Sequence, residues 1–233
     1  MVKSPHLYRP RTNDLSARGE RAARIAKAAQ ERKIPLQAVD AEQIRSASGS
    51  DQHQGVAAFV SPFPVETGPI LFPKNQGQPH EPLLVLLDGI VDPNNLGAIV
   101  RTAHCVGADA LLIPKDRAVG PTPAVSKASA GALEHTRIFR VTNLTTAIQG
   151  LKKEAVWVAG LSMDAQQTVF QADLNGPLAL VIGGEEKGIR PLIRQNCDFL
   201  VRIPLCGRID SLNASAAAAV VLYEAFRQRQ TTV

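Results

Sequence analysis

The 233-residue sequence predicts an α/β protein whose main domain is a parallel sheet flanked by helices. Two strand-length runs, residues 83–87 and 178–182, are apolar at every position, which is typical of parallel strands buried on both faces. From residue 83 onward such runs alternate with helical patterns, as in sheets built from crossover connections. Glycine or polar residues follow the strands, where open parallel sheets bind their ligands. We therefore expect a binding site at the carboxyl edge of this sheet.

The start of the chain is expected to form a small α/β unit. Residues 1–19 are rich in Arg, Pro and Ser and predict a loose arm, whereas residues 20–33 show a helical pattern with a thin apolar stripe. Residues 34–44 add a short strand and turn, and residues 56–60 form a further strand. Frequent proline and glycine then mark a linker. The predicted segments are a small unit over 1–60, a linker over 61–82 and a main domain over 83–233.

The positive charge is concentrated in the small unit. Through Lys33 there are nine Lys or Arg against three Asp or Glu, whereas the formal net charge of the whole chain is only +5. A basic segment of this kind favours a polyanionic partner such as nucleic acid, although a run of charge is also common on an ordinary solvated face. Charge alone leaves both interpretations open.

The main domain is predicted element by element. After the strand at 83–87, Asp92 or Asn94 can cap a helix and Pro93 suits its first turn. A second apolar run at 199–205 precedes an alanine-rich helix that opens near residue 211. The other expected elements are a helix over 96–106, a strand over 110–113, a small helix over 125–131, a strand over 138–141, a helix over 145–153 and a strand over 156–159.

The three cysteines, Cys105, Cys197 and Cys206, are widely spaced and indicate neither a disulfide framework nor a zinc site. No run of about twenty apolar residues is present, and the first residues lack the apolar core of a signal peptide. We therefore expect a cytoplasmic protein without bound metal and without membrane contact.

The first motif combines Asn95 in the turn with Arg101 in the following helix. A single arginine is most often an exposed surface residue. This helix, however, is otherwise nearly free of charge between residues 96 and 103, so we expect it to be buried or to lie at an interface. A cation in such a place needs a partner, and the guanidinium fork suits phosphates and other anions.

Two further turns are ambiguous when each is considered alone. Glu185 follows Gly183-Gly184 and allows two interpretations. It is either a surface acid in a tight turn or a carboxylate aimed at a cationic or hydroxyl-bearing ligand. A nucleotide-binding oxidoreductase is disfavoured, because the paired carboxylates of this turn would repel a pyrophosphate. Ser211 and Asn213 are ordinary N-cap residues for the helix that begins there.

Taken together, the three turns resemble the motifs of the SpoU (TrmH-type) branch of SPOUT RNA 2′-O-ribose methyltransferases. The resemblance extends from about Leu83 to Arg229. Within the branch it is strongest to the bacterial enzymes that methylate a guanosine of 23S rRNA, and it includes the loop at 115–117 and the strand at 53–56. The motifs are DPNNLGAIVR at 92–101, IGGEEKG at 182–188, and IPL at 203–205 with SLNAS at 211–215.

This resemblance implies a parallel-sheet domain with a C-terminal trefoil knot, a homodimer, and S-adenosylmethionine held by the loops of the knot. Arg101 would lie near the ribose 2′-oxygen or its phosphate, while Glu185 and Asn213 would organise the arginine and the cofactor loops. Carried over by motif position, the catalytic residues are Asn95, Arg101, Glu185, Ser211 and Asn213, and the cofactor contacts are Gly183, Gly184, Ile203, Leu205 and Leu212.

The resemblance is incomplete at the start of the chain. The related ribosomal enzymes carry an N-terminal domain similar to ribosomal proteins of the L30e type, whose opening strand and helix are not recognisable before Leu15. The sequence therefore predicts an abbreviated L30e-like unit, in which the basic arm supplies phosphate contacts without choosing a sequence.

The expected function is S-adenosylmethionine-dependent methylation of a ribose 2′-hydroxyl in RNA, with rRNA favoured over tRNA as substrate. A tRNA 2′-O-methyltransferase and a non-catalytic RNA-binding or ribosome-assembly protein of the same fold are the alternatives. The proton acceptor stays open, because the motifs contain no histidine and an arginine is too weakly acidic to serve readily as a base.

Overall fold

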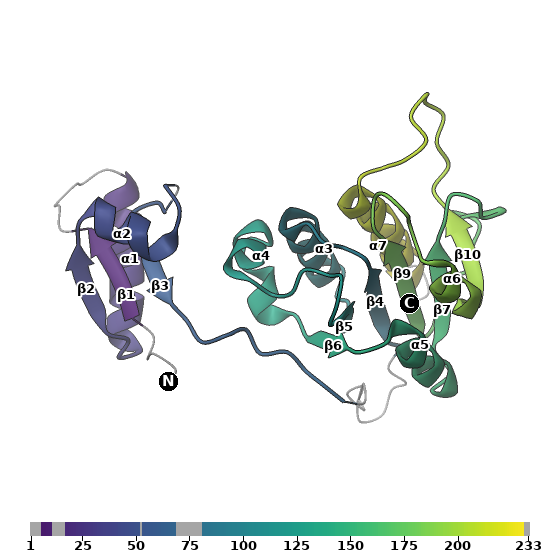
Figure 1. Ribbon diagram of the computed structural model, residues 1–233, viewed down its shortest axis with the longest axis horizontal. Coiled ribbons are helices and arrows are strands. Elements are labelled where there is room, and N and C mark those ends of the chain that lie inside the picture. Colours follow the sequence, from purple (N-terminus) through teal and green to yellow (C-terminus); the bar gives the residue numbers. More distant parts are fainter. Residues whose placement is uncertain (1–5, 11–16, 52, 69–80, 231–233) are drawn as a thin grey trace. The chain divides into compact units, whose positions relative to one another are not determined.

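The structure, a computed structural model, describes residues 6–10, 17–51, 53–68 and 81–230 of the chain (Figure 1). The chain divides into two compact units, residues 1–62 and 63–233. The first unit holds a three-stranded sheet and the second a seven-stranded sheet. Because the three motifs all lie in the second unit, that unit positions the candidate site.

The first unit is built around strand β1 (His6–Pro10), which lies in the middle of the order β2-β1-β3. It pairs in parallel with β2 (Leu36–Val39) and antiparallel with β3 (Ala57–Phe59). The expectation of a loose arm with no opening strand before Leu15 is therefore wrong. β1 is only five residues long and contains Arg and Pro, so its sequence shows no apolar strand pattern. It is a strand because it pairs with a neighbour on each side.

Two helices complete the first unit. The helix expected at 20–33 is α1 (Ala17–Glu31), in which Ala26 and Ala29 are buried. The strand expected within 34–44 is β2, and the second helix, α2 (Ala41–Ser48), begins in the part of that range where a turn was expected. Its first turn is closed by a capping box, because the backbone N–H of Gln43 donates to the Asp40 carboxylate at 2.8 Å and the Gln43 side chain accepts from the Asp40 N–H at 3.2 Å.

The second unit is a fully parallel sheet in the order β6-β5-β4-β9-β7-β10-β8. The two apolar runs that predicted it lie next to each other at its centre, with Leu83 opposite Leu178 and Asp88 opposite Gly183. The predicted fold class is therefore confirmed. The strands are β4 (Leu83–Asp88), β5 (Ala110–Pro114), β6 (Ile138–Val141), β7 (Trp157–Leu161), β8 (Gln167–Thr168), β9 (Leu178–Gly183) and β10 (Phe199–Arg202).

Helices cover both faces of this sheet. Successive residues of β4 point to opposite faces, so that Val85 packs in one core cluster with α3 (Pro93–Cys105) and α7 (Ala214–Gln230). Leu84 packs in the other with α5 (Leu144–Lys153) and α6 (Pro191–Asn196). The shorter elements are α4 (Pro123–Ala128) and a 3₁₀ turn (Ala132–His135). Among the helices of the described residues, none combines the length and the apolar character needed to cross a bilayer.

Part of the range expected as a linker is ordered against the second sheet. The backbone N–H of Glu66 donates to the Ile138 carbonyl at 2.8 Å, and Arg140 donates to the Glu66 carbonyl at 3.0 Å. The Glu66 carboxylate also accepts from the Arg137 guanidinium at 2.8 and 2.7 Å. These hydrogen bonds from Arg137 lower the pKa of Glu66. Glu66 therefore pairs with the β6 edge before the chain reaches β4.

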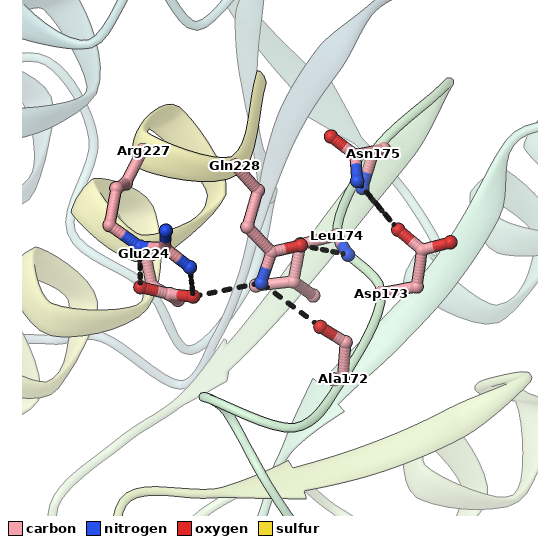
Figure 2. A network of polar contacts seen from close by, with 7 residues as sticks. All are labelled: Ala172, Asp173, Leu174, Asn175, Glu224, Arg227 and Gln228. Atoms are coloured by element: carbon pink, nitrogen blue, oxygen red, sulfur yellow. Dashed lines mark hydrogen bonds and ion pairs between the residues drawn. The ribbon is translucent and has the colours of Figure 1, made fainter. Parts of the chain in front are cut away.

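The end of α7 is fixed by a polar network that Figure 2 shows from close by. Glu224 is buried and accepts from Arg227 at 2.7 and 2.8 Å. Gln228 donates to the same carboxylate at 2.8 Å, donates to the Ala172 carbonyl at 3.0 Å and accepts from the Leu174 N–H at 2.8 Å. The network therefore ties the loop before β9 to the last turns of α7.

Replacing Glu224 with Gln should lower the free energy of unfolding by about 1–3 kcal/mol at pH 7, because a buried charged acceptor is lost. The hydrogen bonds from Arg227 lower the pKa of Glu224 in the folded state. Its contribution is therefore complete above the unfolded value, about 4.3, and is lost as the pH falls through the folded value. Urea unfolding at pH 7 and at low pH should show the difference between parent and variant shrink. The exposed Glu154→Gln should show no difference at either pH.

Candidate active site

The loop after β9 is fastened to the end of β4. Asp88 is only 1% exposed and accepts from the Arg190 backbone N–H at 2.8 Å and from the Arg190 Nε at 2.7 Å. The backbone N–H of Gly184 donates to the Asp88 carbonyl at 2.9 Å. Because a buried carboxylate needs a partner, this pair holds both ends of the 184–190 loop against β4. Sequence reasoning missed it, although a lone Asp at the end of an apolar strand was a usable signal.

One residue from each motif meets at a single point above the sheet. The Glu185 Oε1 accepts from the Asn95 side-chain amide at 3.1 Å, and it also accepts from the Asn213 amide. Asn213 donates in addition to the Asn95 Oδ1 at 2.9 Å, and the Ala214 N–H reaches the Glu185 Oε1 at 3.3 Å. We call Asn95, Glu185 and Asn213 the motif junction. It joins segments that are up to 118 residues apart in the sequence.

Asn213 serves the helix and the junction at the same time. Its Oδ1 accepts from the Ser215 N–H at 3.0 Å, the Ser215 hydroxyl at 2.6 Å and the Ala216 N–H at 3.3 Å. This is the N-cap interaction that the sequence predicts for the start of α7. The Nδ2 of the same side chain bonds to Asn95 and Glu185. Asn213 is therefore the N-cap of α7, as predicted, and it also bonds to one residue from each of the other two motifs.

Two hollows meet at the motif junction. The glycine-loop hollow lies over the ends of β9 and β10, and the central hollow lies over the ends of β4 and β5. Both are lined by Gly184, Glu185 and Ala214. Ser211 and all five predicted cofactor contacts line the glycine-loop hollow, namely Gly183, Gly184, Ile203, Leu205 and Leu212. The chain between β10 and α7 that supplies the last of these extends at the top of Figure 1.

The two glycines of this loop are required by close backbone contacts. A Cβ on Gly183 would overlap the backbone of Gly188 and Ile189. A Cβ on Gly184 would lie 2.6 Å from the Gly89 carbonyl oxygen. Only glycine allows the loop to fold this tightly onto itself and onto the turn after β4. At these two positions the loop therefore presents backbone rather than side chains.

Arg101 lies apart from the motif junction. It is exposed on α3, six residues beyond Asn95, which places it on a different face of the helix. Within the described part of the chain it makes no hydrogen bond or ion pair with Glu185 or Asn213, and these two bond to Asn95 instead. The expectation that Glu185 and Asn213 organise the arginine therefore does not hold within the chain. α3 itself is buried on its other faces, as its lack of charge predicted.

The three cysteines are free thiols. Burial raises the pKa of the Cys197 thiol to about 11, so it is protonated at neutral pH and packs as an apolar side chain under β7 and α6. No group of three His, Cys, Asp or Glu side chains that could hold a metal ion occurs among the residues that the structure places.

Comparison with known proteins gives consistent matches. Residues 82–223 match the SpoU rRNA Methylase family, and residues 14–65 match the family described as RNA 2′-O ribose methyltransferase substrate binding. A protein of Ralstonia nicotianae named 23S rRNA (guanosine-2′-O-)-methyltransferase RlmB is 41% identical over 93% of this chain and 86% of its own length. Its counterpart in Pseudomonas putida is 45% identical over 76% of this chain and 72% of its own length.

The fold has a close match among solved structures. The SpoU methyltransferase AviRb of Streptomyces viridochromogenes, solved with the cofactor AdoMet, aligns with a TM-score of 0.77 and 25% identity. The alignment covers 97% of this chain and 83% of that one. Since the family match covers more than half of the chain and a relative above 40% identity spans nearly all of it, the chain belongs to the SpoU rRNA methylase family.

Proposed function

We propose that this chain transfers the methyl group of S-adenosylmethionine to the ribose 2′-hydroxyl of a guanosine in 23S rRNA. The observation that carries the proposal is the motif junction, which joins Asn95, Glu185 and Asn213 where the two hollows meet. The names of the relatives from Ralstonia nicotianae and Pseudomonas putida support this choice of substrate.

The glycine-loop hollow suits the cofactor. Ile203, Leu205 and Leu212 give it apolar walls for an adenine ring, and Gly183 and Gly184 line it with backbone. When bound there, S-adenosylmethionine supplies an activated methyl group on a sulfonium. The Glu185 carboxylate lies at the boundary of both hollows, where a negative charge favours a cationic sulfur.

The remaining site residues are assigned to the acceptor. Methyl transfer requires the two reacting groups to be held in line, and it requires donors for the charge that develops on the 2′-oxygen. Asn95 lines the central hollow and is fixed by Glu185, so it is placed to orient the ribose. Arg101 is exposed on α3 and available to RNA, and we assign it to the ribose oxygen or the adjacent phosphate.

Substitution of Gly183 tests the cofactor site. We expect Gly183→Ala to weaken S-adenosylmethionine binding by about tenfold or more, because the added Cβ overlaps the backbone of Gly188 and the loop must shift. Isothermal titration of the cofactor into each protein measures this change. Gly150→Ala is the matched control, since Gly150 lies on α5 and a Cβ added there meets nothing within 4 Å. Parental affinity in Gly183→Ala would contradict the assigned site.

We assign RNA binding to the first unit. Its match to a substrate-binding family and the exposed Arg24 and Lys27 on α1 support this role. Contacts from such residues to phosphates give affinity that falls steeply with salt and carries no sequence information by itself. We also propose that the protein acts in the cytoplasm, on rRNA.

We also propose a trefoil knot and a homodimer. For the knot, the support is that α7 packs against β9 while the chain enters α7 from β10, with Glu185 bonded to Asn213 across the two loops.

For the dimer, the support is an apolar face in which Phe170 and Tyr223 are 56% and 52% exposed beside Val220 and Phe226. Sedimentation at micromolar concentration should give a dimer, and a monomer would contradict this part of the proposal.

The proposed reaction is tested by transfer of a radiolabelled methyl group from S-adenosylmethionine to unmodified 23S rRNA and tRNA transcripts. The expected result is incorporation into 23S rRNA at a guanosine 2′-oxygen, located by mapping ribose methylation. Incorporation into tRNA alone would mean that tRNA, and not 23S rRNA, is the substrate. Cofactor binding without any transfer would show a non-catalytic RNA-binding protein.

A further inference from the structure

A third hollow continues the central hollow along the carboxyl edge of the sheet. This side hollow lies over the ends of β5 and β6, against the first residues of α5 and α6. It shares four lining residues with the central hollow, namely Pro114, Asp116, Arg117 and Arg190. The glycine-loop, central and side hollows therefore form one continuous series, with the motif junction between the first two.

The lining of the side hollow is mixed in character. Leu192 is 58% exposed and, with Pro114 and Ile193, provides apolar surface. Thr142 and Thr145 add hydroxyl groups. An apolar surface with a few polar groups suits a planar nucleobase, whose faces are apolar and whose edges carry donors and acceptors. A phosphate would instead favour a lining of cations without carboxylates.

Asp116 and Arg117 are the charged groups available to a ligand in this hollow. Both are exposed, and in the described residues neither makes a hydrogen bond or an ion pair. Arg190 differs, because its guanidinium is paired with the buried Asp88 at 2.7 Å. Arg117 has a φ of 56°, a conformation that residues other than glycine adopt rarely.

We propose that the side hollow binds the guanine base of the nucleotide that is methylated. Guanine presents adjacent N1–H and N2–H₂ donors, which the Asp116 carboxylate accepts, and the O6 and N7 acceptors beside them match the fork of Arg117. Among the four RNA bases, guanine is the one that carries two neighbouring donors from which a single carboxylate can accept. The ribose then lies in the central hollow next to Asn95 and Glu185. This inference rests on the proposed function and adds the residues that select the base.

The test compares guanosine with inosine, which lacks only the 2-amino group. An RNA hairpin carrying the methylated position, identified by mapping in transcribed 23S rRNA, is made with guanosine or inosine at that position. We expect the parent protein to prefer guanosine by about tenfold or more in kcat/KM. We expect Asp116→Asn to methylate guanosine more slowly and to lose the preference. Arg117→Ala should slow both RNAs, because O6 and N7 are present in both bases.

Two controls keep the outcomes separate. Titration with S-adenosylmethionine should give parental affinity in Asp116→Asn and Arg117→Ala, which excludes misfolding of the cofactor site. Glu154→Gln alters an exposed carboxylate directly after α5, outside the three hollows, and should keep the parental preference. If the mapping finds no guanosine of 23S rRNA methylated by the parent, the proposed function fails. If the parent is active and Asp116→Asn keeps the parental ratio of guanosine to inosine, the base-reading role of the side hollow is wrong.

Discussion

Replacing Glu185 with Ala should lower kcat/KM for methyl transfer by about 100-fold or more, a loss comparable to removal of one preorganised polar group from an active site. The Glu185 Oε1 accepts from the side chains of Asn95 and Asn213 and from the backbone of Ala214. Asn95 is 8% exposed, so its amide would lose its partner in a place with little access to water. Both the cofactor loop and the acceptor side should therefore lose their fixed geometry.

The conservative variant separates the charge of Glu185 from its geometry. Glu185→Gln retains one oxygen that can accept from Asn95 and Asn213, so we expect its activity to lie between that of the parent and Glu185→Ala. Glu154→Ala removes an exposed carboxylate from the same unit and should have parental activity. Methyl transfer and cofactor titration on all four proteins provide the measurement. Parental turnover in Glu185→Ala would show that the motif junction takes no part in the reaction.

The motif junction could be predicted because its geometry follows from chain direction. Parallel strands end at one edge of the sheet, so the turns after β4 and β9 had to meet there. The N-cap pattern then placed Asn213 at the start of α7. What the sequence could not supply was the partner of each polar group, since Glu185 bonds to Asn95 rather than to Arg101. That choice depends on the face of α3 on which each residue lies. Residues 95 and 101 lie on different faces, and only residue 95 faces Glu185.

The elements that escaped prediction are short or polar. β1 has five residues, α6 has six and β8 has two, and none is long enough to show a period of its own. β1 is defined by its two neighbours, which a local pattern does not reveal. The Asp88–Arg190 pair was also missed, because it links residues 102 apart in the sequence. A lone Asp at the end of an apolar strand signals that a partner is needed, but the tertiary fold decides which residue that partner is.

Replacing Arg101 with Ala should lower methyl transfer by about 100-fold while leaving S-adenosylmethionine binding within about twofold of the parent. Methyl transfer and cofactor binding should respond differently because Arg101 is exposed on α3 and lines neither the glycine-loop hollow nor the central hollow. Arg101→Lys should recover only part of the activity if the planar fork of the guanidinium contacts the ribose oxygen or a phosphate. Lys153→Ala, which removes an exposed cation from α5, is the matched control. Equal turnover in Arg101→Ala and the parent would remove Arg101 from the mechanism.

The relation between Arg101 and Glu185 can be measured with a double-mutant cycle. The mild substitutions Glu185→Gln and Arg101→Lys keep activity measurable, so the cycle can be completed with the double variant. Two groups that do not touch should have effects on the transition-state free energy that add to within about 0.5 kcal/mol. Additivity is the expected result, since Glu185 bonds to Asn95, Asn213 and Ala214 within the chain. A larger coupling energy would mean that the guanidinium reaches the motif junction only in the RNA complex or across a dimer, because the folded chain by itself keeps the two apart.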